Sequence, residues 1–303
     1  MHPIDLHTHS IRSDGTFTPA ELVQYAHKKG LSAIALTDHD TADGIAEAVQ
    51  AVRALKAQAS GPGRDDARAL PVPELIPGVE LSTEYKGRDI HIVGLFIDWR
   101  NPSFTEKLRE FADARVLRNR KMGRLLTKAG YPVTMAALER AFPGTVITRA
   151  HFAQYLLDRG MISSIDEAFT KLIGDDGPCF VPREKISPQD AVGFLLRYGA
   201  VPVLAHPLQY KMSDKDLLKL VSSLRDIGLV GIETFYCTHK PADTAYLSRI
   251  AERCGLLPSG GSDFHGTRKK NLDLGTGYGH LYVPDTILPP LRAKAGKADT
   301  ETE

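Results

Sequence analysis

Cysteine is scarce in this chain of 303 residues, which contains Cys179, Cys237 and Cys254. These residues are odd in number and far apart, and no Cys-x-x-Cys pair occurs, which excludes a disulfide framework and a cysteine-bound zinc site. No apolar run approaches the roughly 20 residues that cross a bilayer, and the first residues show no charged-then-apolar leader. We therefore expect a cytoplasmic protein that does not bind a membrane.

An excess of charge of either sign is also missing. The chain carries 38 Lys and Arg residues against 37 Asp and Glu residues, a formal net charge of +1. This balance excludes a surface that is basic overall and coats nucleic acid or membranes, although it allows a local basic patch. Hydrophobic residues make up 42% and charged residues 25%, as in globular proteins, and the length fits one large domain or one domain with an insertion.

Short apolar strands alternate with amphipathic helices over residues 1–100 and again over residues 179–290. Over residues 101–178 strand signals almost vanish and helical periodicity takes over, and we expect residues 291–303 to form a flexible tail. Repeated strand–helix units predict a parallel sheet with helices outside, here a barrel or an open sheet with an inserted helical subdomain. In such folds the chemistry collects at the carboxyl ends of the strands. Strands are expected at residues 4–6, 33–36, 75–81, 89–96, 201–204, 230–233 and 257–260.

Six of the eleven histidines lie at the ends or starts of these strands, and three acidic residues accompany them. Imidazole with carboxylate and no thiolate suits Zn, Mn or Fe rather than a closed structural zinc. Nine such groups exceed the needs of one ion, so they predict two or three divalent ions with a bridging carboxylate. The alternative, histidines scattered through a core, would need all six to reach one end of a barrel by chance. The nine residues are His7, His9, Asp14, His39, Glu80, His91, His206, Asp263 and His265.

At these residues the sequence resembles the polymerase and histidinol phosphatase (PHP) family of metal-dependent phosphoesterases. The motifs that carry the resemblance follow the family's order along nearly the whole chain. The resemblance implies an α/β fold, a distorted seven-stranded (β/α) barrel of PHP type with an inserted helical cap subdomain, and a trinuclear metal site. The motifs are Asp5-Leu6-His7-Thr8-His9, Ser13-Asp14-Gly15, Thr37-Asp38-His39-Asp40, Gly78-Val79-Glu80, His91, Ala205-His206-Pro207 and Gly261-Ser262-Asp263-Phe264-His265.

Carried over by position, the resemblance implies three ions, two of which share Glu80. Every ligand position is filled by a usual ligand type, with Mn as the expected metal and Fe or Zn as alternatives. The implied ligand sets are His7, His9, Glu80 and Asp263 for one ion, Glu80, His91 and His206 for a second, and Asp14, His39 and His265 for the third.

Within the family, the layout is most similar to the bacterial branch of 3′,5′-nucleoside bisphosphate phosphatases, which is also described as 5′→3′ exoribonuclease. Residues 115–121 and 148–152 of the insertion, and residues 205–213, carry this narrower resemblance. It implies hydrolysis of the 3′-phosphate of a nucleoside 3′,5′-bisphosphate, with 5′→3′ trimming of short RNA as a further activity. The implied substrate is a small nucleotide or a short RNA, and no protein partner is evident.

The insertion places arginines on a helical stripe that is otherwise apolar. Over residues 105–129, Arg115 and Arg118 fall on the same stripe as Leu108, Phe111, Met122 and Leu125. A buried arginine needs a partner, which is either an ion pair with the barrel or a second phosphate of the substrate, since guanidinium suits bidentate phosphate binding. The candidate substrate-binding residues are Arg118, Arg149, Lys211 and His239, and Glu233 is a candidate support for the metal ligands.

The expected chemistry uses a hydroxide that bridges the metal ions, and no protein nucleophile is evident. Three other functions stay open. A histidinol-phosphate phosphatase would use the same metals but has no obvious need for a second anion-binding arginine. A PHP-type exonuclease domain of the proofreading kind is a third enzymatic option. A binding module would retain ions without hydrolysing any phosphoester.

Overall fold

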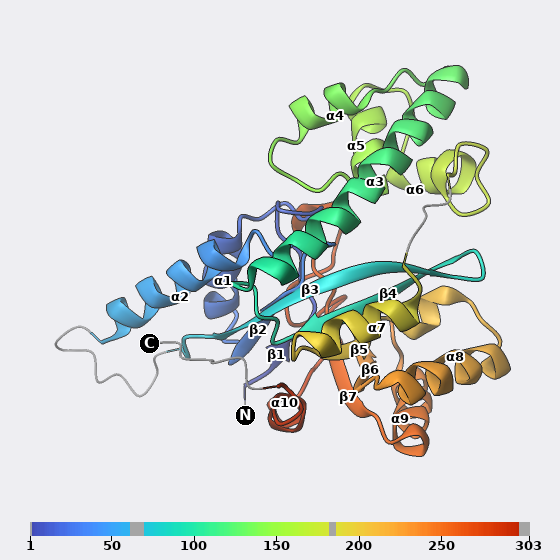
Figure 1. The fold of residues 1–303 in the computed structure, drawn as a ribbon. Helices are drawn as coiled ribbons and strands as arrows, with labels where there is room; N and C mark the ends of the chain where they lie inside the picture. The colour runs from blue at the N-terminus through green and yellow to red at the C-terminus, as the bar shows by residue number, and fades with distance from the viewer. Residues whose placement is uncertain (1, 61–69, 182–185, 297–303) are drawn as a thin grey trace.

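The computed structural model describes residues 2–60, 70–181 and 186–296 of the chain. Its described part contains one sheet of seven strands in sequence order (Figure 1). Backbone hydrogen bonds join the two edges of this sheet, from Leu6 N to Gly260 O at 3.1 Å and from Asp263 N to His7 O at 2.9 Å. The sheet is therefore a barrel, as expected. The strands are β1 Ile4–Asp5, β2 Ala33–Leu36, β3 Glu74–Tyr85, β4 Arg88–Leu95, β5 Val201–Leu204, β6 Gly231–Tyr236 and β7 Leu257–Gly261.

The barrel is distorted because one strand runs against the others. Neighbouring strands are parallel except at β4, which is antiparallel to both β3 and β5. Lys86 and Gly87 form the turn between β3 and β4 with φ angles of 52° and 76°. A turn this short joins only antiparallel strands, because a parallel connection needs a crossover of a dozen or more residues. The parallel sheet predicted from the strand–helix repeats therefore has one antiparallel strand, β4, and the distorted barrel is confirmed.

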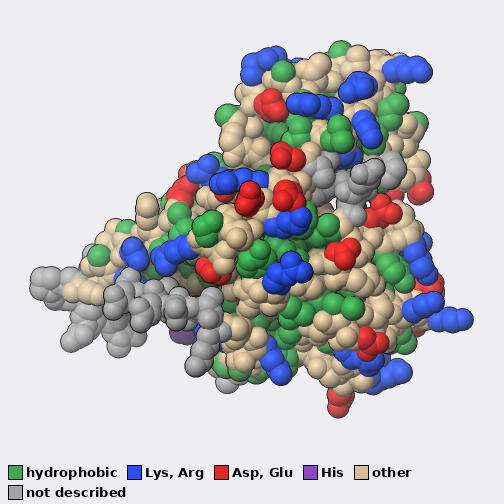
Figure 2. All heavy atoms as spheres, in the orientation of Figure 1, with side chains coloured by type: hydrophobic (Ala, Val, Ile, Leu, Met, Phe, Trp, Pro, Cys, Tyr) green, Lys and Arg blue, Asp and Glu red, His purple; other side chains and the backbone are tan. Residues whose placement is uncertain are grey.

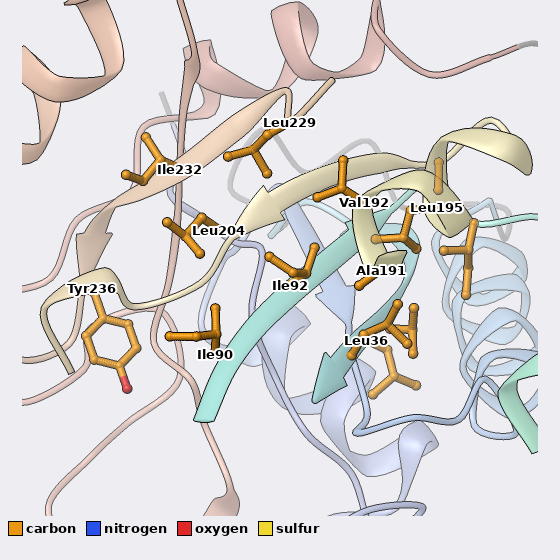
Figure 3. Close-up of a cluster of buried hydrophobic side chains, with 14 of the residues drawn as sticks. Leu36, Ile90, Ile92, Ala191, Val192, Leu195, Leu204, Leu229, Ile232 and Tyr236 are labelled. Atoms are coloured by element: carbon orange, nitrogen blue, oxygen red, sulfur yellow. The ribbon is translucent and has the colours of Figure 1, made fainter. Parts of the chain in front are cut away.

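Six helices of the described chain pack against the barrel, five around its wall and the last at the end opposite the insertion (Figure 1). The first begins as its sequence predicts, with Thr18 and Glu21 in a capping box and Pro19 in the first turn. Figure 3 shows how Val192 and Leu195 of the third of these helices lie close to Ile92 of β4 in a shared apolar cluster. These helices are α1 Pro19–Lys28, α2 Ile45–Ala59, α7 Pro188–Arg197, α8 Asp214–Ile227, α9 Pro241–Cys254 and α10 Leu288–Arg292.

Alternation along the strands separates two cores. In β2, Ile34 and Leu36 face the helices, whereas Ala33 and Ala35 belong to a second core of barrel residues, as a period of two requires. Leu291 of α10 is fully buried in this second core. The expected tail was therefore wrong at its start, since residues 291 and 292 are helical; residues 297–303 lie outside the described residues.

The insertion forms a helical subdomain over one end of the barrel, here called the cap (residues 102–173). Its longest helix, α3, runs from the barrel out into the cap, and the shorter helices pack beside its far half (Figure 1). Met122 and Leu126 are fully buried in the cap's own core, whereas Leu125, expected on the buried stripe, is 37% exposed. The elements are α3 Pro102–Lys128, α4 Met135–Ala141, α5 Arg149–Asp158, α6 Ile165–Ala168 and the π-helical turn η1 Phe169–Ile173. No described helix is long and apolar enough to cross a membrane.

The seam between β7 and β1 has no room for a side chain at Gly261. A Cβ atom there would lie 2.5 Å from both Cβ and N of His7, so we expect Gly261→Ala to destabilise the fold by about 1–3 kcal/mol. Gly193 in α7 is the control, because its Cβ would meet nothing within 4 Å and Ala favours a helix by about 0.5–1 kcal/mol. Urea unfolding should give shifts of opposite sign, and equal shifts would contradict this account of the seam.

Candidate active site

The nine side chains singled out in the sequence meet at the end of the barrel that faces the cap. β1, β2, β5 and β7 end just before their histidines, so those side chains reach the same rim. His91 lies in the first half of β4, and because β4 is antiparallel its start lies at the rim where its neighbours end. β3 extends beyond the rim and carries Glu80 in its middle.

Glu80 lies at the centre of the cluster and is 1% exposed. Its Oε2 is 3.3 Å from His7 Nε2, 3.2 Å from His9 Nε2 and 3.0 Å from His39 Nδ1. Its Oε1 is 2.8 Å from His91 Nδ1 and 3.0 Å from His206 Nε2. The two oxygens of one carboxylate therefore face two different sets of imidazoles.

The two other carboxylates lie on either side of this centre. Asp263 Oδ1 is 3.3 Å from His9 Nε2 and 3.7 Å from His7 Nε2. Asp14 Oδ1 is 3.2 Å from His265 Nε2, and its Oδ2 is 3.8 Å from His39 Nε2. The cluster therefore divides into neighbouring groups of imidazole and carboxylate.

The charges of the cluster follow from burial and from each other. Burial alone would raise the pKa of Glu80, but His39, His91 and His7 outweigh it and hold that pKa well below its usual value. Burial likewise opposes ionisation of Asp14, and His39 and His265 keep its pKa well below the usual value. Burial lowers the pKa of His39 to about 3. Burial opposes protonation of His7 and His9 as well, but the carboxylates around them raise the pKa of His7 well above its usual value and that of His9 to about 9. Ionised carboxylates thus hold protons on some of the surrounding imidazoles, which a bound metal ion would displace.

Several of these atoms are buried without any hydrogen-bond partner, among them Nε2 of His7, Nε2 of His9, Nδ1 of His39 and Oδ1 of Asp14. An unsatisfied buried polar atom costs about 1–3 kcal/mol, and here imidazole nitrogens and carboxylate oxygens face one another. The residues form four groups of three or four members. Within each group, the possible ligand atoms lie within 4.8 Å of one another. Converging lone pairs of N and O ligands are what divalent transition metals bind, so the residues fit a metal cluster. The groups are His9, Asp14, His39 and His265; His7, Glu80 and His206; His7, His9 and Asp263; and His39, Glu80 and His91.

Other buried groups orient these side chains. Glu233 Oε1 lies 2.8 Å from His7 Nδ1, which turns Nε2 of that ring toward Glu80, and Glu233 Oε2 accepts the backbone N–H of His206 at 2.6 Å. His206 and Asp263 have left-handed backbones, with φ angles of 26° and 54°. Strain of this kind at non-glycine residues persists only where the surroundings enforce it, and it gathers at functional sites.

The structure adds two residues that sequence reasoning missed. Lys269 Nζ donates to Asp263 Oδ2 at 2.5 Å, and Tyr236 donates its hydroxyl to the same oxygen at 2.7 Å. Lys269 follows the irregular segment after β7, where no periodicity places a side chain. Tyr236 is the last residue of β6, three residues after Glu233. Its position at the end of a strand could therefore have indicated from the sequence that it lies at the rim.

A pocket of about 150 Å³ lies between the cluster and the cap. Barrel residues contribute acidic and imidazole groups to its lining, and the cap contributes three arginines. A small anionic molecule in this pocket would therefore touch both the cluster and the cap. The lining residues are Asp14, His39, Ser82, Asp89, His91, Arg115, Arg118, Thr148, Arg149, Ala150 and Phe169.

The two arginines of the α3 stripe are both buried and both line the pocket. Arg115 forms an ion pair with Asp40 and donates to Ser82 Oγ at 2.7 Å. For Arg115 the ion pair with the barrel is thus the correct interpretation. Arg118 lies one turn further along α3.

The other three candidate substrate-binding residues differ in position. Arg149 lines the pocket, and its guanidinium donates to Asp89 Oδ2 at 2.6 Å and to Asp175 Oδ1 at 2.7 Å. Lys211 is exposed after a short helical turn and does not line this pocket. His239 is buried, with Nδ1 3.0 Å from the carbonyl oxygen of Thr234, and it also lies outside the pocket lining.

The cap also touches the cluster directly through Thr148, the residue before α5. Its hydroxyl donates to Asp14 Oδ2 at 3.0 Å, and the ring of His151 accepts its backbone N–H at 3.0 Å in a capping box. The start of α5 therefore fixes both the cap and one carboxylate of the cluster.

Comparison with known proteins agrees with this geometry. Residues 5–171, more than half of the chain, match the PHP domain. The chain is 36% identical to the 5′-3′ exoribonuclease of Haemophilus influenzae over 86% of this chain and 89% of that protein. It is 33% identical to the 3′,5′-nucleoside bisphosphate phosphatase of Chromobacterium violaceum over 91% of each chain. A solved amidohydrolase from Chromobacterium violaceum with bound sulfate and no metal has a TM-score of 0.80 and 32% identity, over 96% of both chains.

Two independent kinds of evidence thus agree. The structure is a seven-stranded barrel with nine clustered imidazoles and carboxylates, and the relatives match along most of the sequence. This chain belongs to the PHP family of metal-dependent phosphoesterases.

Proposed function

We propose that this chain hydrolyses the 3′-phosphate of nucleoside 3′,5′-bisphosphates and that it also trims short RNA from the 5′ end. One observation carries the proposal. Arg118 and Arg149 of the cap line the same pocket as members of the imidazole–carboxylate cluster. One phosphate of such a molecule would face the ions that the cluster would hold, and the other would face the cap arginines. The names of the relatives from Chromobacterium violaceum and Haemophilus influenzae support the same two activities.

Glu80 would be shared by two of the ions, because its two oxygens face different imidazoles. Bound divalent ions would polarise the phosphoryl oxygens and lower the pKa of water. Glu233 would hold His7 in the orientation that presents Nε2 to an ion, in the way that outer carboxylates commonly orient metal-bound histidines. Manganese as the ion, three as the number of ions and the cytoplasm as the location stay predictions from the sequence.

The protein groups around the pocket would position the substrate rather than attack it. The hydroxyls of Ser82 and Thr148 are engaged with Arg115 and Asp14, and the three cysteines are buried. Arg118 would hold the second phosphate through its planar guanidinium. Phosphoryl transfer depends mainly on positioning and on neutralised charge, and this pocket offers both.

A histidinol-phosphate phosphatase would fit the cluster equally well but fits the pocket less well. Histidinol phosphate has one phosphate, so it offers no second anion for Arg118. A PHP-type exonuclease acting on longer chains stays an alternative, because it would need the same cluster.

Phosphate release by Mn-loaded protein tests the substrate. We expect adenosine 3′,5′-bisphosphate to be preferred over adenosine 3′-monophosphate, adenosine 5′-monophosphate and histidinol phosphate. Arg118→Ala should lower kcat/KM for the bisphosphate by about 10- to 100-fold, the value of a hydrogen bond to a charged group, with little effect on the 3′-monophosphate. Arg140→Ala, an exposed change in the same cap, is the matched control. Preference for histidinol phosphate, unaffected by Arg118→Ala, would contradict the proposal.

Metal content tests the role of Glu80 without any assay of activity. Reconstituted wild-type protein should hold two or three Mn ions per chain by elemental analysis, and Glu80→Gln should lose at least one because the shared ligand is weakened. Glu84→Gln, four residues further along β3 and away from the cluster, should keep the wild-type content. Chelation should abolish phosphate release and Mn should restore it. Unchanged Mn content in Glu80→Gln would refute the shared-ligand role.

Thr148 allows a test of the link between cap and cluster. Thr148→Val removes the hydroxyl that donates to Asp14, so we expect Mn affinity to fall about tenfold, as for other groups that orient metal ligands. Thr148→Ser should restore it, because Ser keeps the donor. Thr170→Val removes a hydroxyl that bonds within the cap and should bind Mn like the wild type. Calorimetric Mn titration of all four proteins decides the point, and equal affinities would show that the contact does not matter.

A further inference from the structure

The second half of α3 carries positive charge on its exposed side and no negative charge at all. Residues 114–128 contain no Asp or Glu, although the whole chain balances 38 basic against 37 acidic residues. Four cations of this segment are exposed, and with the described residues they form no ion pair. Figure 2 shows Lys and Arg side chains over the cap in the upper part of the view. The basic strip is defined as Arg120, Lys121, Arg124 and Lys128.

The spacing of these residues gathers them on one side of the helix. At 3.6 residues per turn the four side chains fall within an arc of about 100°. Arg120 and Arg124, and then Arg124 and Lys128, are like charges at i and i+4, which destabilise a helix by a few tenths of a kcal/mol per pair. Other exposed helix faces of this chain mix charges of both signs. For example, α8 begins with the exposed residues Asp214, Lys215 and Asp216. A concentrated charge of this kind is explained by an anionic ligand.

Along α3 the strip follows a pocket-lining residue but lies on another side of the helix, since at about 100° per residue Arg118 is about 60° round from Lys121 and about 160° from Arg120. Arg118 lines the pocket, and Lys121 follows it by three residues, which is nearly one turn. From Arg118 to Lys128 the helix rises about 15 Å, and α3 points away from the barrel in this direction (Figure 1). That length matches about four phosphates of a stacked strand at about 3.4 Å each. Leu117 and Leu125 are 54% and 37% exposed and offer apolar surface for bases beside the cations.

We propose that the basic strip binds the sugar–phosphate backbone of single-stranded RNA whose 5′ end lies in the pocket. This inference rests on the proposed function, because it needs the pocket to take a nucleotide. Charge complementarity and the closeness of Lys121 to Arg118 along α3 select this partner over an anionic membrane, which would not need cations next to the pocket. The strip thereby gives RNA contacts that a lone bisphosphate is too short to make.

Steady-state kinetics on two substrates test the strip. We expect the double variant Arg120→Glu/Arg124→Glu to raise KM for a 5′-phosphorylated 12-residue RNA by about tenfold or more and to flatten its salt dependence, because fewer counterions are released. Kinetics on adenosine 3′,5′-bisphosphate should change less than twofold. The matched control is Lys215→Glu/Lys219→Glu on exposed positions of α8, which should leave both substrates unaffected. Arg120→Gln/Arg124→Gln, a milder change at the same positions, should give a smaller KM effect of the same direction.

Binding of a labelled RNA of the same sequence, measured by fluorescence anisotropy without turnover, separates this inference from the proposed function. If the wild type binds RNA and the Arg120→Glu/Arg124→Glu variant binds it at least tenfold more weakly, the strip is supported even when the bisphosphate is not hydrolysed. Equal RNA binding by wild type, variant and control would overturn the strip while the proposed function could still stand. Binding to vesicles of anionic phospholipid that the variant loses, with RNA binding unchanged, would also overturn it.

Discussion

The buried Glu80 carboxylate, surrounded by five imidazoles, is the constraint on which the rest of this structure depends. A buried charge is tolerated only when it is paired or bound to metal. The fold meets this demand by placing Glu80 in the middle of the longest described strand, where backbone pairing with Val93 on one side and with residues 38–40 on the other fixes its position. Reversal of β4 then brings His91 to the same rim. The distortion of the barrel is thus part of how the cluster is assembled.

The cap is tied to this centre at two points with different consequences. Arg115 of α3 pairs with Asp40, the residue after His39, and Asp40 has a left-handed backbone with φ of 53°. Thr148 donates to the carboxylate of Asp14 itself. Both contacts reach the side of the cluster that contains His39 and Asp14. A shift of the cap would therefore disturb that side first, while the Glu233 contact to His7 lies wholly within the barrel.

The sequence predicted the positions of several cluster members because these are encoded locally. An imidazole or carboxylate directly after a strand reaches the rim whatever the rest of the chain does, and this holds for His7, His206 and Asp263. Lys269 follows a short 3₁₀ turn, so no periodic pattern indicates where its side chain points. The choice between an ion pair and a substrate phosphate as the partner of Arg115 depended on Asp40, which lies 75 positions away in the sequence. The start of the expected tail was wrong for a similar reason, because the partners that bury Leu291 are distant in sequence.

The proposed activities on a small nucleotide and on the end of an RNA share one chemistry, the hydrolysis of a phosphoester, which is a monoester in the bisphosphate and a diester in the RNA. Both substrates present a phosphoester to the imidazoles and carboxylates, and the choice between them falls to whatever binds the rest of the molecule. In the proposed function that task falls to the inserted residues rather than to the barrel, since the pocket arginines come from α3 and α5. Changes in the insertion can therefore alter substrate preference without disturbing Glu80. The strands that hold the cluster, by contrast, tolerate little change. A side chain at Gly261 would collide with His7, and His206 and Asp263 already have strained backbones.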